Sequence, residues 1–221
     1  MSKSNKYGYV GVDIPEQSFG NNKGIFNPAE INELVADNKW TQYGQLELIS
    51  TTTISSAVAT VDIQNIKEDI YNVHLLIFSG LNGVSNNTEE VQMQMYENGT
   101  LETAGVYQFA RQRVRGSGTF NEQRSTASAV IRFSNWDYWD NNGSTGAYMY
   151  VYNAGDSSKY TFCTFHNTGF DSEYGGSGTY TSQFGSGVLP QSSVVDGFHL
   201  KTLFGTNIGA GTISLYGIRY S

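Results

Sequence analysis

The chain has 221 residues, a formal net charge of −7 and one cysteine, and only 15% of its residues are charged. This acidic balance argues against general affinity for nucleic acid or a membrane surface, and a single cysteine excludes an internal disulfide framework. The 25 glycines and 14% aromatic residues are typical of many short strands joined by tight turns.

The first forty residues predict an extended arm followed by one short helix. Residues 1–23 contain several glycines and asparagines and show no hydrophobic periodicity. Asn27 is a good helix N-cap, Pro28 suits the first turn, and Ile31 and Leu34 fall on one apolar stripe. Because a helix of about eleven residues is marginal in water, we expect it to dock on another surface.

The chain therefore divides into an attachment segment, residues 1–44, and a β-sheet domain, residues 45–221. The start of the chain has no apolar run like that of a signal peptide, which indicates folding in a reducing cytoplasm. Aromatic and apolar side chains of the attachment segment are the candidates for assembly contacts: Tyr7, Tyr9, Phe19, Phe26, Ile31, Leu34 and Trp40.

From residue 45 onward, apolar residues recur at every second position, which indicates strands. Strands are predicted within 46–54, 58–63, 72–79, 91–96, 105–114, 127–133, 146–152, 159–167, 174–184, 194–204 and 212–216. Loops are predicted at 82–88, 115–124 and 135–145. Ten or so strands with one helix predict an all-β protein, an antiparallel jelly-roll-like β-sandwich with one short N-terminal helix.

The hairpin expected over 146–167 is the centre of this prediction. Successive side chains of a strand alternate between faces. One face of its first strand is therefore small and aliphatic and suits the core, whereas the other carries Tyr148, Tyr150 and Tyr152. Tyrosine buries its ring but needs a partner or water for its hydroxyl, so this face suits a neighbouring element or subunit. Cys163, in the second strand, is expected to be buried.

Several phrases of the sequence resemble a known group of proteins. They are Lys6–Val10, Asp13–Pro15, Gln17–Phe26, Ile31–Leu34 and Trp40–Ile49 near the start, and Thr212–Ile218 near the end. These phrases resemble small virion structural proteins of marine tailed phages, notably those that infect cyanobacteria.

The resemblance implies a non-enzymatic structural protein of a bacteriophage virion, made in the host cytoplasm and displayed as a capsid decoration or a tail or fibre component. The N-terminal arm would attach it to other virion proteins. Jelly rolls are common in such positions, and so are homo-oligomers, trimers among them. The resemblance carries no catalytic motif and implies no cofactor.

The segment 134–143 combines tryptophan and tyrosine rings with aspartate and asparagine side chains, more densely than any other part of the sequence. The aromatic rings can stack on sugar faces while the carboxylates and amides bind sugar hydroxyl groups, which suggests a glycan site for recognition of a host receptor. The same oxygen atoms suit calcium, although the spacing does not match an EF-hand. Packing of the rings at the end of the sandwich is favoured over both. The residues concerned are Trp136, Asp137, Tyr138, Trp139, Asp140 and Asn141.

Two further sets of side chains are predicted to be structural. Arg111, Arg113 and Arg115 fall on one strand face, where solvation or pairing with carboxylates of a neighbour is favoured over phosphate or acidic-glycan binding. His74, His166 and His199 each lie in a separate predicted strand, and core or edge positions are favoured over a zinc site. No metal site and no cofactor are therefore predicted.

Overall fold

The computed structural model describes residue 26 and residues 28–36, 46–84, 87–134, 137–139, 145–171 and 178–218. The chain divides into two compact units, residues 1–44 and 45–221, and each is described by itself. In the first unit, helix α1 spans Pro28–Ala36, within the region where a helix is predicted, and none of its residues is buried.

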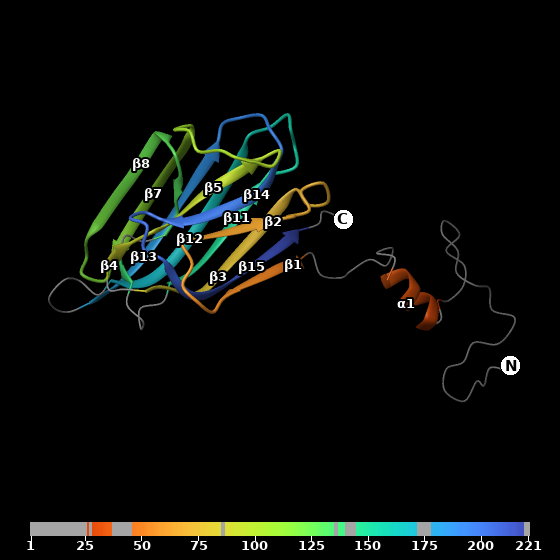
Figure 1. Ribbon diagram of the computed structural model, residues 1–221, viewed down its shortest axis with the longest axis horizontal. Helices are drawn as coiled ribbons and strands as arrows, with labels where there is room; N and C mark the ends of the chain where they lie inside the picture. The colour runs from red at the N-terminus through yellow and green to blue at the C-terminus, as the bar shows by residue number, and fades with distance from the viewer. Residues whose placement is uncertain are drawn as a thin grey trace, which may run out of the picture. The chain divides into compact units, whose positions relative to one another are not determined.

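The second unit contains a large antiparallel sheet of eight strands (Figure 1). In spatial order these are β1 (Leu46–Ile54), β15 (Ile208–Ile218), β3 (Val73–Gly83), β11 (Thr145–Tyr152), β12 (Thr161–Asp171), β13 (Thr179–Leu189), β7 (Tyr107–Arg115) and β8 (Phe120–Ser128). The predicted hairpin over 146–167 is confirmed as β11 and β12, which pair from Gly146 with Thr168 to Tyr152 with Phe162.

A smaller sheet covers one side of this large sheet. Its strands are β2 (Thr60–Gln64), β14 (Val195–Thr202), β5 (Val91–Glu97) and β6 (Thr100–Leu101), and β9 (Ile131–Arg132) also pairs with β5. A separate two-stranded ribbon consists of β4 (Asn87–Glu89) and β10 (Asp137–Trp139).

The strand order confirms the predicted jelly-roll-like β-sandwich. The orders β1-β15-β3-β11 in one sheet and β2-β14-β5-β9 in the other are those of an eight-stranded jelly roll. Four further strands, β12, β13, β7 and β8, extend the first sheet beyond this frame. The large sheet therefore has one extended face that points away from the core.

The core lies between the sheets and is built from alternate side chains of each strand. Leu76 of β3, Met93 of β5 and Phe198 of β14 are completely buried, and so is Met149 of β11. Cys163 is buried too, as predicted. Its burial raises the pKa of the thiol to about 12, although a backbone hydrogen bond from Gly187 acts in the other direction.

Some predicted boundaries are wrong. The loop expected at 115–124 contains the first half of β8, and the strand expected at 127–133 is divided between β8 and β9, which lie in different sheets. β8 is an edge strand whose side chains are mostly exposed, so its sequence needs no apolar alternation. The loops expected at 82–88 and 135–145 contain parts of β4 and β10.

Candidate functional site

The outer face of the eight-stranded sheet, the face that points away from the core, is the candidate site. Alternation along β11 places its tyrosines there, opposite the buried Met149 and Val151. Nine large apolar side chains of this face are each at least 45% exposed: Leu46, Leu48, Phe120, Tyr148, Tyr160, Phe162, Phe170, Tyr180 and Phe184.

The aromatic rings of this face contact one another. Tyr148 packs edge-on against Tyr150 and against His166 of β12, with ring centroids 6.0 and 5.7 Å apart. Tyr150 in turn stacks on Tyr152 at 6.4 Å. The hydroxyl of Tyr152 lies 3.2 Å from Thr164 Oγ1, and His166 Nε2 lies 2.8 Å from Ser182 Oγ. These contacts within the chain therefore fix the orientation of the rings.

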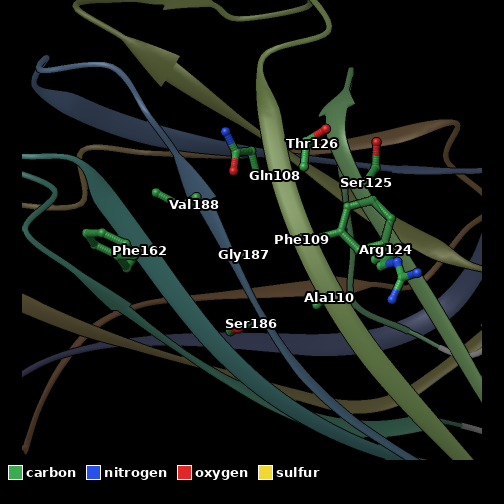
Figure 2. A pocket seen from close by; sticks show the side chains of 10 residues that line it. All are labelled: Gln108, Phe109, Ala110, Arg124, Ser125, Thr126, Phe162, Ser186, Gly187 and Val188. Carbon is green, nitrogen blue, oxygen red and sulfur yellow. The ribbon is translucent and has the colours of Figure 1, made fainter.

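A hollow of about 690 Å³ opens on the same face over β12, β13, β7 and β8 (Figure 2). Strand register places short side chains at its floor, because Ser186 of β13 pairs with Ala110 of β7. Phe162 and Arg124 stand on opposite sides of these short residues (Figure 2). The hollow results from small residues flanked by larger ones.

Charge is confined to the edge of the outer face. The outward-facing positions of β11, β12 and β13 in the described residues carry no Asp, Glu, Lys or Arg. On the edge strand β8, Arg124 Nη1 lies 3.0 Å from Glu122 Oε1, and both side chains are more than 70% exposed. The centre of the face is therefore uncharged and rich in aromatic rings, and the charged side chains lie at its β8 edge.

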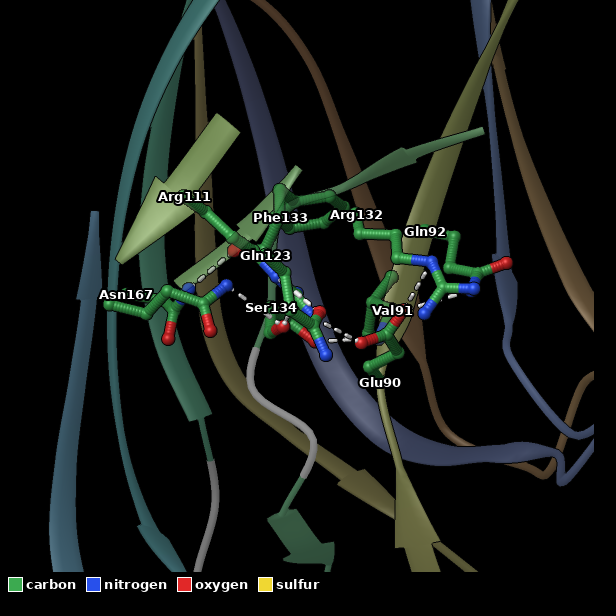
Figure 3. Close-up of polar contacts among 10 residues, drawn as sticks. Glu90, Val91, Gln92, Arg111, Gln123, Arg132, Phe133, Ser134 and Asn167 are labelled. Atoms are coloured by element: carbon green, nitrogen blue, oxygen red, sulfur yellow. Dashed lines mark hydrogen bonds and ion pairs between the residues drawn. The ribbon is translucent and has the colours of Figure 1, made fainter. Parts of the chain in front are cut away.

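A second cluster, of polar side chains, lies inside the sandwich (Figure 3). Arg111 is 6% exposed and Glu90 is completely buried, and Arg111 Nη2 donates to Glu90 Oε2 at 2.6 Å. Arg111 also donates to the carbonyl of Ser134 at 2.6 Å and to Gln123 Oε1 at 2.9 Å. Burial lowers the pKa of the Arg111 guanidinium, while Glu90 opposes that shift.

The rest of this cluster ties the two sheets together. Glu90 Oε1 accepts a hydrogen bond from Gln92 Nε2 at 2.9 Å, and Arg132 Nε lies 3.4 Å from the same oxygen. Asn167 donates to the carbonyl of Phe133. Because the charges are engaged with each other, we interpret this cluster as structural. The arginine stripe was expected to be solvated or to pair with carboxylates of a neighbour, but Arg111 is buried and pairs with Glu90 of the same chain.

The three histidines lie on different faces. His74 is buried in the core, where its Nε2 lies 2.9 Å from the carbonyl of Ile66, and burial lowers its pKa. His166 lies on the outer face, and His199 lies on the smaller sheet with Nδ1 2.6 Å from Asp62 Oδ1. Across the described residues, no group of three or more His, Cys, Asp or Glu could hold a metal ion.

The predicted glycan residues can be placed only in part. Asp137, Tyr138 and Trp139 form β10, whose pairing with β4 the sequence did not predict. Trp136, Asp140 and Asn141 lie outside the described residues. The proposed glycan site therefore stays a prediction.

The predicted assembly residues are likewise placed in part. Phe26, Ile31 and Leu34 are partly exposed, the last two on α1. Tyr7, Tyr9, Phe19 and Trp40 lie outside the described residues.

Sequence reasoning found the tyrosines of the outer face but missed the hollow and Glu90. The hollow depends on cross-strand neighbours such as Ser186 and Ala110, which are 76 positions apart in the sequence. Glu90 precedes the strand expected at 91–96, and its position directly beside this strand was the one available signal of its burial.

Comparisons with known proteins do not identify a family. No protein-family model matches the sequence, and no curated protein matches it. A solved structure, a protein of unknown function from Shewanella oneidensis MR-1, is 8% identical, with 90% of this chain and 98% of that chain covered and a TM-score of 0.22. A similarity this low carries no argument about fold or function. Among the described helices, none is long and apolar enough to span a membrane.

Proposed function

We propose that the chain is a non-enzymatic structural protein of a bacteriophage particle, in which residues 45–221 are displayed and residues 1–44 attach the protein to other virion proteins. The broad, uncharged aromatic outer face carries the proposal, because a large exposed apolar patch marks a surface that binds other molecules. The choice of a phage particle rests on the phrases that resemble those of phage virion proteins, and the jelly-roll body is compatible with it.

The attachment role rests on the first unit. Helix α1 has no buried residue, and Ile31 and Leu34 lie on its partly covered side. A short helix of this kind gains most of its stability from packing its apolar stripe on another surface. The unit is therefore suited to docking on a virion protein, and the body carries the exposed surface.

Deletion of residues 1–39 tests the attachment role. We expect a folded body that is absent from purified particles, measured by immunoblotting of particles and by labelling of intact virions in electron microscopy. Ile31→Asp should reduce incorporation into particles at least tenfold, whereas Asn32→Asp, at the neighbouring exposed position, should not. Particles that still carry the truncated protein would contradict the proposal.

The second candidate is receptor recognition through a host-surface glycan. Asp137–Trp139 forms a two-stranded ribbon with β4 that is hydrogen-bonded to neither the large nor the smaller sheet. A glycan array comparing wild type with Trp139→Ala tests this candidate. Glycan binding that Trp139→Ala abolishes would support a glycan site in this ribbon. If neither protein binds a glycan, only the structural role remains.

A further inference from the structure

We propose that the outer face of the eight-stranded sheet binds the same face of a second copy of this chain, through a twofold axis. This inference concerns the purified protein and does not depend on a role in a phage particle. The nine exposed apolar side chains that define the face, together with the hollow beside Phe162, are the observations that carry it.

The area of the face matches what a stable dimer needs. A large aromatic side chain has about 150–250 Å² to bury, so the seven aromatic side chains among the nine, each about half exposed, leave on the order of 700 Å² open, and Leu46 and Leu48 add to this area. Each partner of a standard-size interface contributes about 800 Å². One face of this chain therefore suffices for one half of a stable interface.

The distribution of charge favours a second copy of an acidic chain. With a net charge of −7, two copies repel each other wherever acidic groups meet. The centre of the outer face is free of charged side chains in the described strands β11, β12 and β13, and the ion pair of Glu122 and Arg124 lies at its edge. Protein interfaces are likewise depleted of charged residues at their core and enriched there in aromatic residues.

The shape of the face is complementary to itself. Phe162 is 46% exposed and stands beside the hollow whose floor is Ser186 and Ala110. A twofold axis between the ring and the hollow places the ring of each copy over the hollow of the other, because an isologous contact uses the same patch twice. The mutual packing of Tyr148, Tyr150 and Tyr152 keeps these rings ordered, which lowers the entropic cost of association.

Sedimentation equilibrium of the full chain tests the proposal. We expect wild type to have twice the mass of the 24.3 kDa chain at micromolar concentration. Phe184→Lys, which puts a charge on the face at a position 48% exposed, should raise the dissociation constant at least about 100-fold, because the twofold axis doubles each substitution. Phe204→Lys is the matched control: Phe204 is 63% exposed in the turn after β14 and should leave the dimer intact.

Hydroxyl-radical footprinting of wild type gives a second readout that needs no variant. Labelling of Tyr148, Phe162 and Tyr180 should fall severalfold as concentration rises through the dimer transition, while Phe204 stays constant. A monomer at all concentrations, or a dimer that survives Phe184→Lys, would overturn the proposal. Protection of the face in a monomer would show that another part of the chain covers it, and a trimer would exclude the twofold pairing.

Discussion

The buried pair of Arg111 and Glu90 is the residue-scale feature with the largest expected effect on stability. Removal of one partner from a buried ion pair leaves an uncompensated charge, which costs about 3–5 kcal/mol. Arg132 and Gln92 still contact Glu90 when Arg111 is replaced. We therefore expect Arg111→Met to lower the free energy of unfolding by about 3 kcal/mol, the lower end of that range.

Urea denaturation of three variants checks this value. Arg124→Met is the matched control, because its partner Glu122 is 72% exposed and a surface pair contributes at most about 1 kcal/mol. The double variant Glu90→Gln with Arg111→Met should recover part of the loss, since no buried charge is left from this pair. A cost below about 1 kcal/mol for Arg111→Met would show that the contacts of Arg132 and Gln92 alone are enough to hold the buried charge of Glu90.

Asp62, on β2, gives a pH-dependent prediction at the same scale. Burial acts to raise its pKa, but hydrogen bonds from His199 at 2.6 Å and Tyr96 at 2.7 Å outweigh this, so the pKa lies below the usual 3.8. A carboxylate with a lowered pKa in the folded state contributes stability above its unfolded pKa, and that contribution disappears as pH falls through the folded pKa.

The free energy of unfolding, measured from about pH 6 down to about pH 2, should therefore differ between wild type and Asp62→Asn in a pH-dependent way. We expect a constant difference above about pH 5 that shrinks below the usual pKa of Asp62. Tyr96→Phe removes one of the two hydrogen bonds and should give an intermediate profile. Parallel curves for wild type and Asp62→Asn would show that these bonds do not hold the carboxylate in its charged form.

At the scale of the element, β15 depends on a position that only glycine fits. A Cβ added at Gly217 would overlap the ring of Tyr71, which is 1% exposed. Because overpacking forces buried groups to shift, Gly217→Ala should cost about 1–3 kcal/mol in the free energy of unfolding. Gly146→Ala in β11 is the control, since its new Cβ would come no closer than 3.8 Å to Thr168 Oγ1. Equal stability of the two variants would contradict the prediction.

The alternation of apolar and polar residues predicted the strands that pack one whole face on the core. The hairpin of β11 and β12 was recognisable because apolar and aromatic residues alternate along it. β8 was missed because Phe120–Ser128 is an edge strand whose exposed side chains obey no burial pattern. β9 and β10 are too short for any periodicity to show.

The candidate site was predictable at the level of one strand and no further. The outward tyrosines of β11 follow from alternation alone. The hollow and the uncharged centre of the outer face depend on the order β11-β12-β13-β7-β8, in which β7 precedes β11 in the chain yet lies beside β13. Such long-range pairing sets which residues become neighbours, and local propensity carries no information on it.

At the scale of the whole molecule, the extension of the jelly roll determines what the protein can bind. An eight-stranded jelly roll has two sheets of four strands, and each sheet packs one of its faces on the core. The four added strands double the width of one sheet and therefore double its outer face. Seven of the nine exposed apolar side chains belong to these four strands or to β11, or directly precede them: Phe120, Tyr148, Tyr160, Phe162, Phe170, Tyr180 and Phe184.

The last prediction concerns the independence of the body from the first forty-four residues. Every described residue of the hydrophobic core lies between Ile54 and Leu215, and α1 buries none of its side chains. The chain 45–221 should therefore fold alone and keep the free energy of unfolding of the full chain to within about 0.5 kcal/mol, the usual effect of changes away from the core. Urea denaturation of both proteins, followed by far-UV circular dichroism, measures this. A loss above about 2 kcal/mol would mean that the first unit stabilises the sandwich, and attachment would then compete with folding for the same residues.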